Sequence, residues 1–109
     1  MSRETQLTRG LKRRLMYVEN KDGEIDGANG RVGWVSFSKS GQTVYYRGRE
    51  LGRVKGGGIR GNYIDVATRE EYWVSGVKRR GPNAHSAEMG VTVVIDPDAL
   101  DDYRALKTA

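Results

Sequence analysis

Short runs of alternating apolar and polar residues, separated by turn-forming residues, dominate the chain. Three of them lie in the first half, at 14–20, 31–38 and 43–49. In the third run Val44 and Tyr46 share one face, because successive side chains of a strand point to opposite sides. Such runs are typical of antiparallel strands joined by tight turns.

The second half of the chain continues this pattern. A short strand is predicted at 51–55, a hairpin at 62–67 and 71–77, and a β-branched strand at 91–95. Three consecutive glycines at 56–58 predict a corner, since glycine has no side chain to pack and tolerates most backbone angles.

The last apolar pattern is helical and covers 97–107. Leu100 and Tyr103 are spaced as one face of a short amphipathic helix. Asp96 is expected as its N-cap, with Pro97 at the first helical position. The sequence therefore predicts a mainly β fold, a small and highly curved antiparallel sheet or barrel with one short C-terminal helix at 97–107.

Length and composition favour a single small domain. The chain has 109 residues, and its lack of cysteine excludes a disulfide scaffold, a thiolate zinc site and a thiol nucleophile. We expect one β-rich domain at 14–109, preceded by a flexible basic arm at 1–13. The arm lacks the apolar middle of a signal peptide, and no apolar run is long enough to span a bilayer. These features predict a cytoplasmic protein with no membrane partner.

Charge is distributed in blocks along the chain. The formal net charge is +5, with basic blocks at 1–14, 47–60 and 78–80 and an acidic block at 96–106. Blocks of one sign attract partners of the opposite sign. The pattern fits two interpretations equally, a face that binds a polyanion and a solvated basic face that keeps the protein soluble.

Aromatic residues alternate with other aromatic and aliphatic residues along the predicted strands. Basic residues gather at or just beyond the strand ends. Exposed aromatic rings stack on bases and neighbouring arginines neutralise phosphates, which is how small barrels bind single strands. The alternative is that the aromatic rings fill the small core while arginine stems cover it. The candidate binding residues are Trp34, Tyr45, Arg47, Arg49, Arg53, Lys55, Arg60, Tyr63, Trp73, Lys78, Arg79 and Arg80.

Two glycine-containing loops resemble ligand-binding motifs without matching them. The loop at 55–62 offers backbone N–H groups beside basic residues, but it lacks the spacing of a phosphate-binding loop. The loop at 22–27 has alternating carboxylates, but Gly33 stands where a calcium loop requires a glutamate. We therefore predict a tight corner and a solvated turn at these positions, with no metal site and no cofactor.

Candidate catalytic residues are few. His85 is the only histidine, and its neighbour Glu88 lies in the same polar loop. Asp65 and Glu71 belong to the second predicted hairpin, where they can simply pair with arginines. None of these residues forms a recognised catalytic signature, so the sequence predicts a protein that is not an enzyme.

Three tracts resemble small, uncharacterised bacterial proteins of similar length. They are SFSKSGQTVYYRGR within 35–49, KGGG followed by GNY and D within 55–65, and EYWVSG at 71–76. The resemblance implies a stand-alone, cytoplasmic bacterial protein, and it carries no activity or catalytic residue.

The sequence thus predicts a non-enzymatic binding module with nucleic acid, RNA or single-stranded DNA, as one candidate partner. The alternative is a protein-interaction module, such as an inhibitor, an immunity-like factor or an accessory subunit acting on a bacterial protein. Tyrosine, tryptophan and arginine are the residues that dominate binding energy at protein interfaces, so both hypotheses use the same side chains.

Overall fold

The computed structural model of the protein describes residues 8–55, 61–78 and 92–108. Its elements are, in chain order, β1 (Lys12–Asn20), β2 (Gly30–Phe37), β3 (Thr43–Tyr46), β4 (Arg49–Arg53), β5 (Tyr63–Asp65), β6 (Glu71–Gly76), β7 (Val93–Ile95), the 3-10 helix η1 (Pro97–Ala99) and α2 (Leu100–Thr108).

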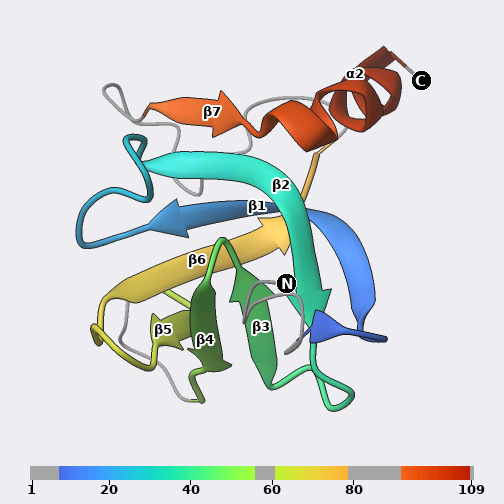
Figure 1. The fold of residues 1–109 in the computed structure, drawn as a ribbon. Coiled ribbons are helices and arrows are strands. Elements are labelled where there is room, and N and C mark those ends of the chain that lie inside the picture. The colour runs from blue at the N-terminus through green and yellow to red at the C-terminus, as the bar shows by residue number, and fades with distance from the viewer. Residues whose placement is uncertain (1–7, 56–60, 79–91, 109) are drawn as a thin grey trace.

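Six of these strands close into an antiparallel barrel. Around the barrel the strand order is β1-β6-β5-β4-β3-β2, and the ring is completed because β1 pairs with both β2 and β6 (Figure 1). Closure gives each of the six strands a partner on both sides. The prediction of a mainly β fold, a small curved sheet or barrel with one short C-terminal helix, is confirmed.

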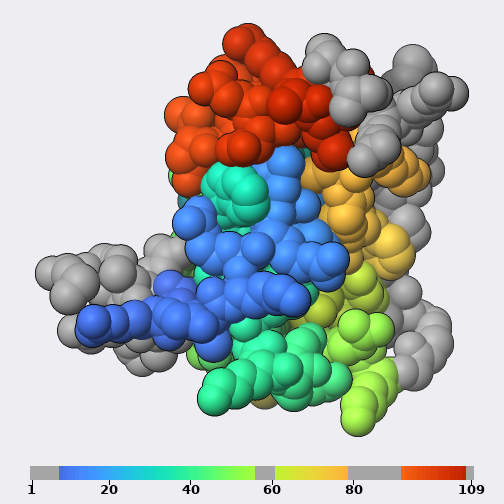
Figure 2. All heavy atoms as spheres, turned by 90° about the vertical axis from the view of Figure 1, so that its right-hand side faces the viewer, coloured from blue at the N-terminus to red at the C-terminus, as the bar shows by residue number. Residues whose placement is uncertain are grey.

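On the side away from β1, β2 pairs with two different strands along its length. Its first residues, Gly30 to Val32, pair in parallel with β7, whereas Ser36 and Phe37 pair with β3. The stretch at 33–35 lies between these two pairings. After β7 the chain continues into η1 and α2, and α2 lies above β1 when the barrel is seen from the side (Figure 2). No helix in the described part of the chain is long and apolar enough to cross a membrane.

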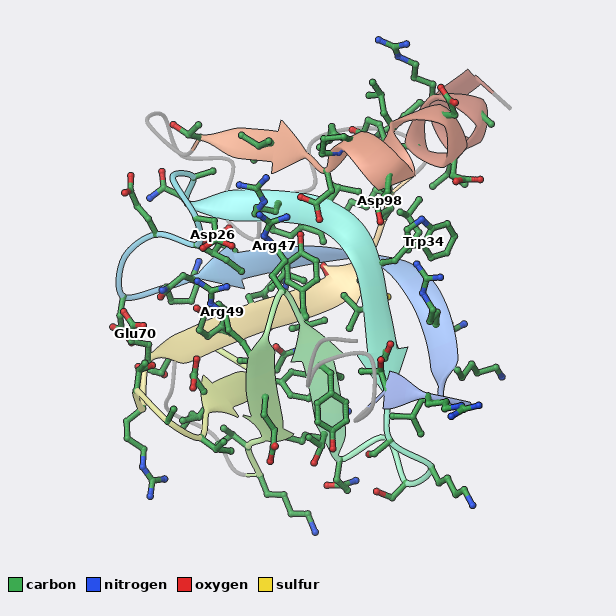
Figure 3. The ribbon with its side chains drawn as sticks, viewed as in Figure 1. Asp26, Trp34, Arg47, Arg49, Glu70 and Asp98 are labelled. Carbon is green, nitrogen blue, oxygen red and sulfur yellow. The ribbon has the colours of Figure 1, made fainter. Side chains whose placement is uncertain are left out.

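The predicted strand at 43–49 is divided by a hairpin turn, which corrects the prediction. Arg47 and Gly48 both have positive φ, 47° and 78°, and they connect β3 to β4 at the centre of Figure 3. Two central residues with positive φ are the requirement of the hairpin turn that matches the twist of paired strands. Arg47 therefore lies at the tip of a hairpin.

β1 begins earlier than the sequence pattern predicts. The pattern places its start at 14, whereas the structure pairs Lys12 with Phe37 and Arg13 with Ser36. These two basic residues lie in the barrel wall, opposite the last residues of β2.

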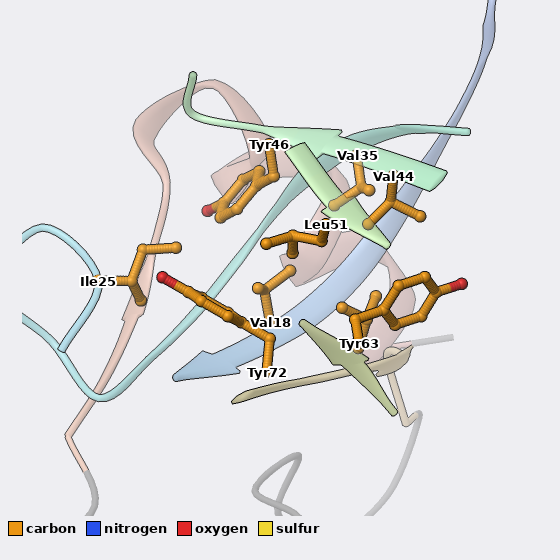
Figure 4. Packing of buried hydrophobic residues seen from close by; sticks show 9 residues of the cluster. Val18, Ile25, Val35, Val44, Tyr46, Leu51, Tyr63 and Tyr72 are labelled. Atoms are coloured by element: carbon orange, nitrogen blue, oxygen red, sulfur yellow. The ribbon is translucent and has the colours of Figure 1, made fainter. Parts of the chain in front are cut away.

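The barrel interior contains the inward-facing residues of alternating strand positions. Four valines, one leucine, one isoleucine and three tyrosines form its main cluster (Figure 4). Burial of each such side chain contributes about 1.5–3 kcal/mol. The cluster consists of Val18, Ile25, Val35, Val44, Tyr46, Leu51, Tyr63, Tyr72 and Val74. Three of the nine aromatic residues thus belong to the core cluster, whereas neither tryptophan does.

Candidate nucleic-acid interface

Asp96 is the centre of a buried polar network where β7 leads into η1. Its Oδ1 accepts a hydrogen bond from Arg31 Nε at 2.8 Å, and its Oδ2 accepts one from the Tyr46 hydroxyl. The side chains of Arg31 and Asp96 are only 9% and 5% exposed. Burial, with the adjacent Asp96 carboxylate, raises the pKa of Tyr46, so its hydroxyl stays protonated and donates. This network holds the start of η1 against β2 and β3.

The side chain of Asp96 does not cap the helix. Asp96 occupies the predicted N-cap position, and its carbonyl accepts the backbone N–H of Ala99 at 2.9 Å, but its carboxylate makes no capping hydrogen bond. Space for that carboxylate inside the barrel comes from Gly33. A Cβ at Gly33 would overlap Asp96 Oδ2 and lie 2.8 Å from the Tyr46 hydroxyl.

Two arginines at the tip of the β3–β4 hairpin share the carboxylate of Asp26. Arg47 Nε donates to Asp26 at 2.6 Å, and Arg49 donates through Nη2 at 2.9 Å and Nη1 at 3.2 Å. These hydrogen bonds, from Arg49 and then Arg47, lower the pKa of Asp26 to about 2. Arg47 also lies 3.5 Å from Asp96, which connects this pair of arginines to the buried network.

Trp34 is a partly exposed aromatic residue on the outer face of β2. The guanidinium of Arg13 lies over its ring, 5.3 Å from the centroid, which is within the range of a cation–π interaction. Its Nε1 donates to the backbone carbonyl of Asp98 at 3.3 Å, so η1 fixes the orientation of the indole. Trp34 and Asp98 lie side by side in Figure 3.

Trp34, Tyr45 and the hairpin tip surround one hollow of about 580 Å³, which we call the Trp34 hollow. Its volume lies within the range of small-molecule sites, about 300–1,000 Å³. Half-buried rings from β2 and β3, with guanidinium groups of β1 and the hairpin tip, form its cationic and aromatic wall, and the start of η1 contributes carboxylates. The complete lining is Thr8, Arg13, Asp26, Trp34, Ser36, Tyr45, Tyr46, Arg47, Asp96 and Asp98.

Positive charge continues from the Trp34 hollow along the first half of β1. Arg9, Lys12, Arg13 and Arg14 are all exposed in the described part of the chain. On the other side of the hollow, the first turn of α2 carries Asp101 and Asp102, which are exposed as well. The face therefore has a basic side and an acidic side.

The structure brings some of the predicted binding residues together and separates others. Trp34, Tyr45 and Arg47 line the Trp34 hollow, and Arg49 lies beside Arg47. The ring of Tyr63 is buried in the core. The remaining residues lie elsewhere: Trp73 half-buried on β6, Arg53 and Lys55 exposed at the far end of the β3–β4 hairpin, Lys78 exposed after β6, and Arg60, Arg79 and Arg80 outside the described residues.

Arg13 and Asp98 were not among the predicted site residues. Arg13 belongs to a basic block that the sequence shows plainly, but only the pairing of β1 with β2 places it over Trp34. Asp98 reads in the sequence as a residue of the first helical turn. Its contact with Trp34 depends on the parallel pairing of β7 with β2, for which the sequence has no local signal.

Asp65 and Glu71, considered above as catalytic candidates, both make structural hydrogen bonds, Asp65 through its carboxylate and Glu71 through its backbone. Asp65 accepts hydrogen bonds from the backbone N–H groups of Ala67 at 2.8 Å and Thr68 at 3.2 Å, which fixes the turn between β5 and β6. The backbone N–H of Glu71 donates to Asp22 at 2.7 Å. His85 lies outside the described residues.

Comparison with known proteins gives no match to a family model, a curated protein or a solved structure.

Proposed function

We propose that this protein binds single-stranded nucleic acid, RNA or DNA, without catalysing a reaction. The observation that carries the proposal is that two half-exposed aromatic side chains, Trp34 and Tyr45, line the same hollow as two arginines, Arg13 and Arg47. Stacking of bases on aromatic rings beside a basic groove is the general mode of single-strand binding.

The hollow favours a single strand over a duplex. A base can enter a hollow and stack on Trp34 or Tyr45 only when it is unstacked from its neighbours. Unstacking a base costs less free energy in a single strand than in a duplex. The indole of Trp34 is held by its hydrogen bond to the Asp98 carbonyl, and strand pairing with Ser36 fixes the backbone of Tyr45. The fixed orientation of the indole reduces the entropy lost on binding.

The charges around the hollow set the path of the strand. Phosphates are attracted to Arg13, the exposed residue of β1 that lines the hollow, and are repelled by Asp101 and Asp102 at the start of α2. The bound nucleic-acid strand therefore runs along β1 with one base in the Trp34 hollow. Phosphate contacts of this kind release counterions, so affinity falls steeply as salt rises.

Trp34→Ala is expected to weaken binding of a mixed-sequence single-stranded oligonucleotide by about 5- to 150-fold, the effect of losing a base stack of about 1–3 kcal/mol. The measurement is fluorescence anisotropy at low salt, repeated over a series of salt concentrations. Trp34→Phe keeps an aromatic ring and should retain most of the affinity.

Trp73→Ala is the matched control, because Trp73 is the other tryptophan, is half-buried on β6 and does not line the Trp34 hollow. It should leave the affinity nearly unchanged. Equal affinity of Trp34→Ala and the wild type would place the strand elsewhere. Failure of the wild type to bind at low salt would remove the proposal and favour the protein-interaction alternative.

A further inference from the structure

Three N–H donors from two arginines converge on one carboxylate at the hairpin tip. Asp26 receives them from Arg47 Nε, Arg49 Nη1 and Arg49 Nη2, at 2.6, 3.2 and 2.9 Å. A carboxylate has two oxygens for these three donors, whereas a phosphate monoester has three terminal oxygens. Planar guanidinium groups match phosphate geometry as well as they match carboxylate geometry.

The converging donors are accessible to a ligand. The side chains of Arg47, Asp26 and Arg49 are 35%, 38% and 25% exposed. The Trp34 hollow lies on one side of Arg47, and a second hollow of about 660 Å³ lies along Arg47, Gly48 and Arg49. A ligand can therefore approach both guanidinium groups from a hollow, where it competes with the partly exposed carboxylate of Asp26.

The backbone on both sides of this contact is in an uncommon conformation. Arg47 and Asp26 have φ of 47° and 50°, in the left-handed region that asparagine and glycine usually occupy. Such positions cost free energy, and they cluster at ligand-binding and switch regions. At Arg47 the conformation places a guanidinium, instead of a short side chain, at the tip of the hairpin between the two hollows.

The charge count of the connected network also favours a phosphate. Arg31, Arg47 and Arg49 contribute three positive charges, and Asp26 and Asp96 contribute two negative ones. A phosphate monoester carries about −1.5 to −2 charges at pH 7, so its exchange for Asp26 brings the network closer to neutrality.

We infer that Arg47 and Arg49 form a binding site for a phosphate monoester, and that Asp26 occupies this site when no ligand is bound. The ligand chemistry is a terminal phosphate group, either on a nucleic-acid strand or as free phosphate. That a nucleic-acid strand supplies this phosphate rests on the proposed function. Because Arg47 lines the Trp34 hollow, the terminal base would stack beside Trp34 while its phosphate binds the two arginines.

The test compares oligonucleotides of one sequence that carry a 5′-phosphate, a 3′-phosphate or no terminal phosphate, with inorganic phosphate as a separate ligand followed by nuclear magnetic resonance. The wild type should bind one phosphorylated form at least about fivefold more tightly than the unphosphorylated form, a modest value for charge-assisted hydrogen bonds at an exposed site. Asp26→Asn removes the competing negative charge and keeps nearly the same side-chain shape. It should raise the affinity ratio of phosphorylated to unphosphorylated oligonucleotide by about another fivefold.

Arg49→Ala should abolish the preference in both backgrounds, whereas Arg53→Ala, an exposed arginine at the other end of β4, should leave it intact. If Asp26→Asn prefers no phosphorylated form and inorganic phosphate does not perturb the arginine signals, the inference is wrong, even if unphosphorylated strands bind through Trp34. If inorganic phosphate binds more tightly to Asp26→Asn while no oligonucleotide binds, the phosphate site stands and the proposed function fails.

Discussion

Asp96→Ala is expected to lower the free energy of unfolding by about 3–5 kcal/mol, the usual cost of removing one partner of a buried ion pair. The variant leaves the guanidinium of Arg31, only 9% exposed, without its carboxylate, and leaves the Tyr46 hydroxyl without its acceptor. The measurement is equilibrium unfolding in urea, followed by tryptophan fluorescence and circular dichroism.

Asp98→Ala is the matched control for this effect. Asp98 lies two residues further along, is exposed, and contacts Trp34 through its backbone carbonyl, which alanine retains. Its replacement should change stability by no more than about 0.5 kcal/mol. Similar losses for both variants would show that local helix electrostatics, and not the buried network, explains the role of Asp96.

Gly33→Ala is expected to lower the free energy of unfolding by about 3 kcal/mol, at the upper end of the usual cost of overpacking. The new methyl group would overlap Asp96 Oδ2 and lie 2.8 Å from the Tyr46 ring and hydroxyl. Both side chains are held by hydrogen bonds and cannot move aside without breaking the network. Gly76→Ala, in β6, meets nothing within 4 Å and should be close to neutral in the same unfolding measurement.

A double-mutant cycle connects these two predictions. In the Asp96→Ala background the main obstacle to a methyl group at Gly33 is absent, so the second substitution should cost less than it does alone. The stability losses of Gly33→Ala and Asp96→Ala should therefore be clearly less than additive. Additive losses would show that the strain at Gly33 arises from another contact, such as that with Tyr46.

The elements follow from the sequence because each strand carries its own alternation and most turns carry their own turn residues. The hairpin tip at Arg47 and Gly48 was missed, because apolar and polar residues continue to alternate across it and arginine is not a typical residue for positive φ. Its conformation is supported by contacts with Asp26 and Asp96, which are distant in the sequence.

The candidate site was predicted only in part, for a related reason. Alternation assigns neighbouring residues to opposite faces, but when both faces carry tyrosines it does not say which face is inside. The sequence pattern places Tyr63 among the binding residues, but in the structure its ring is buried in the core, on β5 opposite Tyr72. Asp96 was read as a helix cap because its local sequence fits that role. The preference of its carboxylate for Arg31 becomes visible only when β7 lies against β2.

The double pairing of β1 has a consequence during synthesis. β2 follows β1 directly in the chain, whereas the other partner of β1, β6, leaves the ribosome only after β2, β3, β4 and β5. Until then one edge of β1 exposes unpaired N–H and C=O groups, which can recruit strands of other nascent chains. Lys12, Arg13 and Arg14 occupy the start of this strand, and like charges on neighbouring chains repel one another. These basic residues precede the stretch of β1 that pairs with β6, Met16 to Asn20, and we expect them to reduce aggregation of the unfinished barrel.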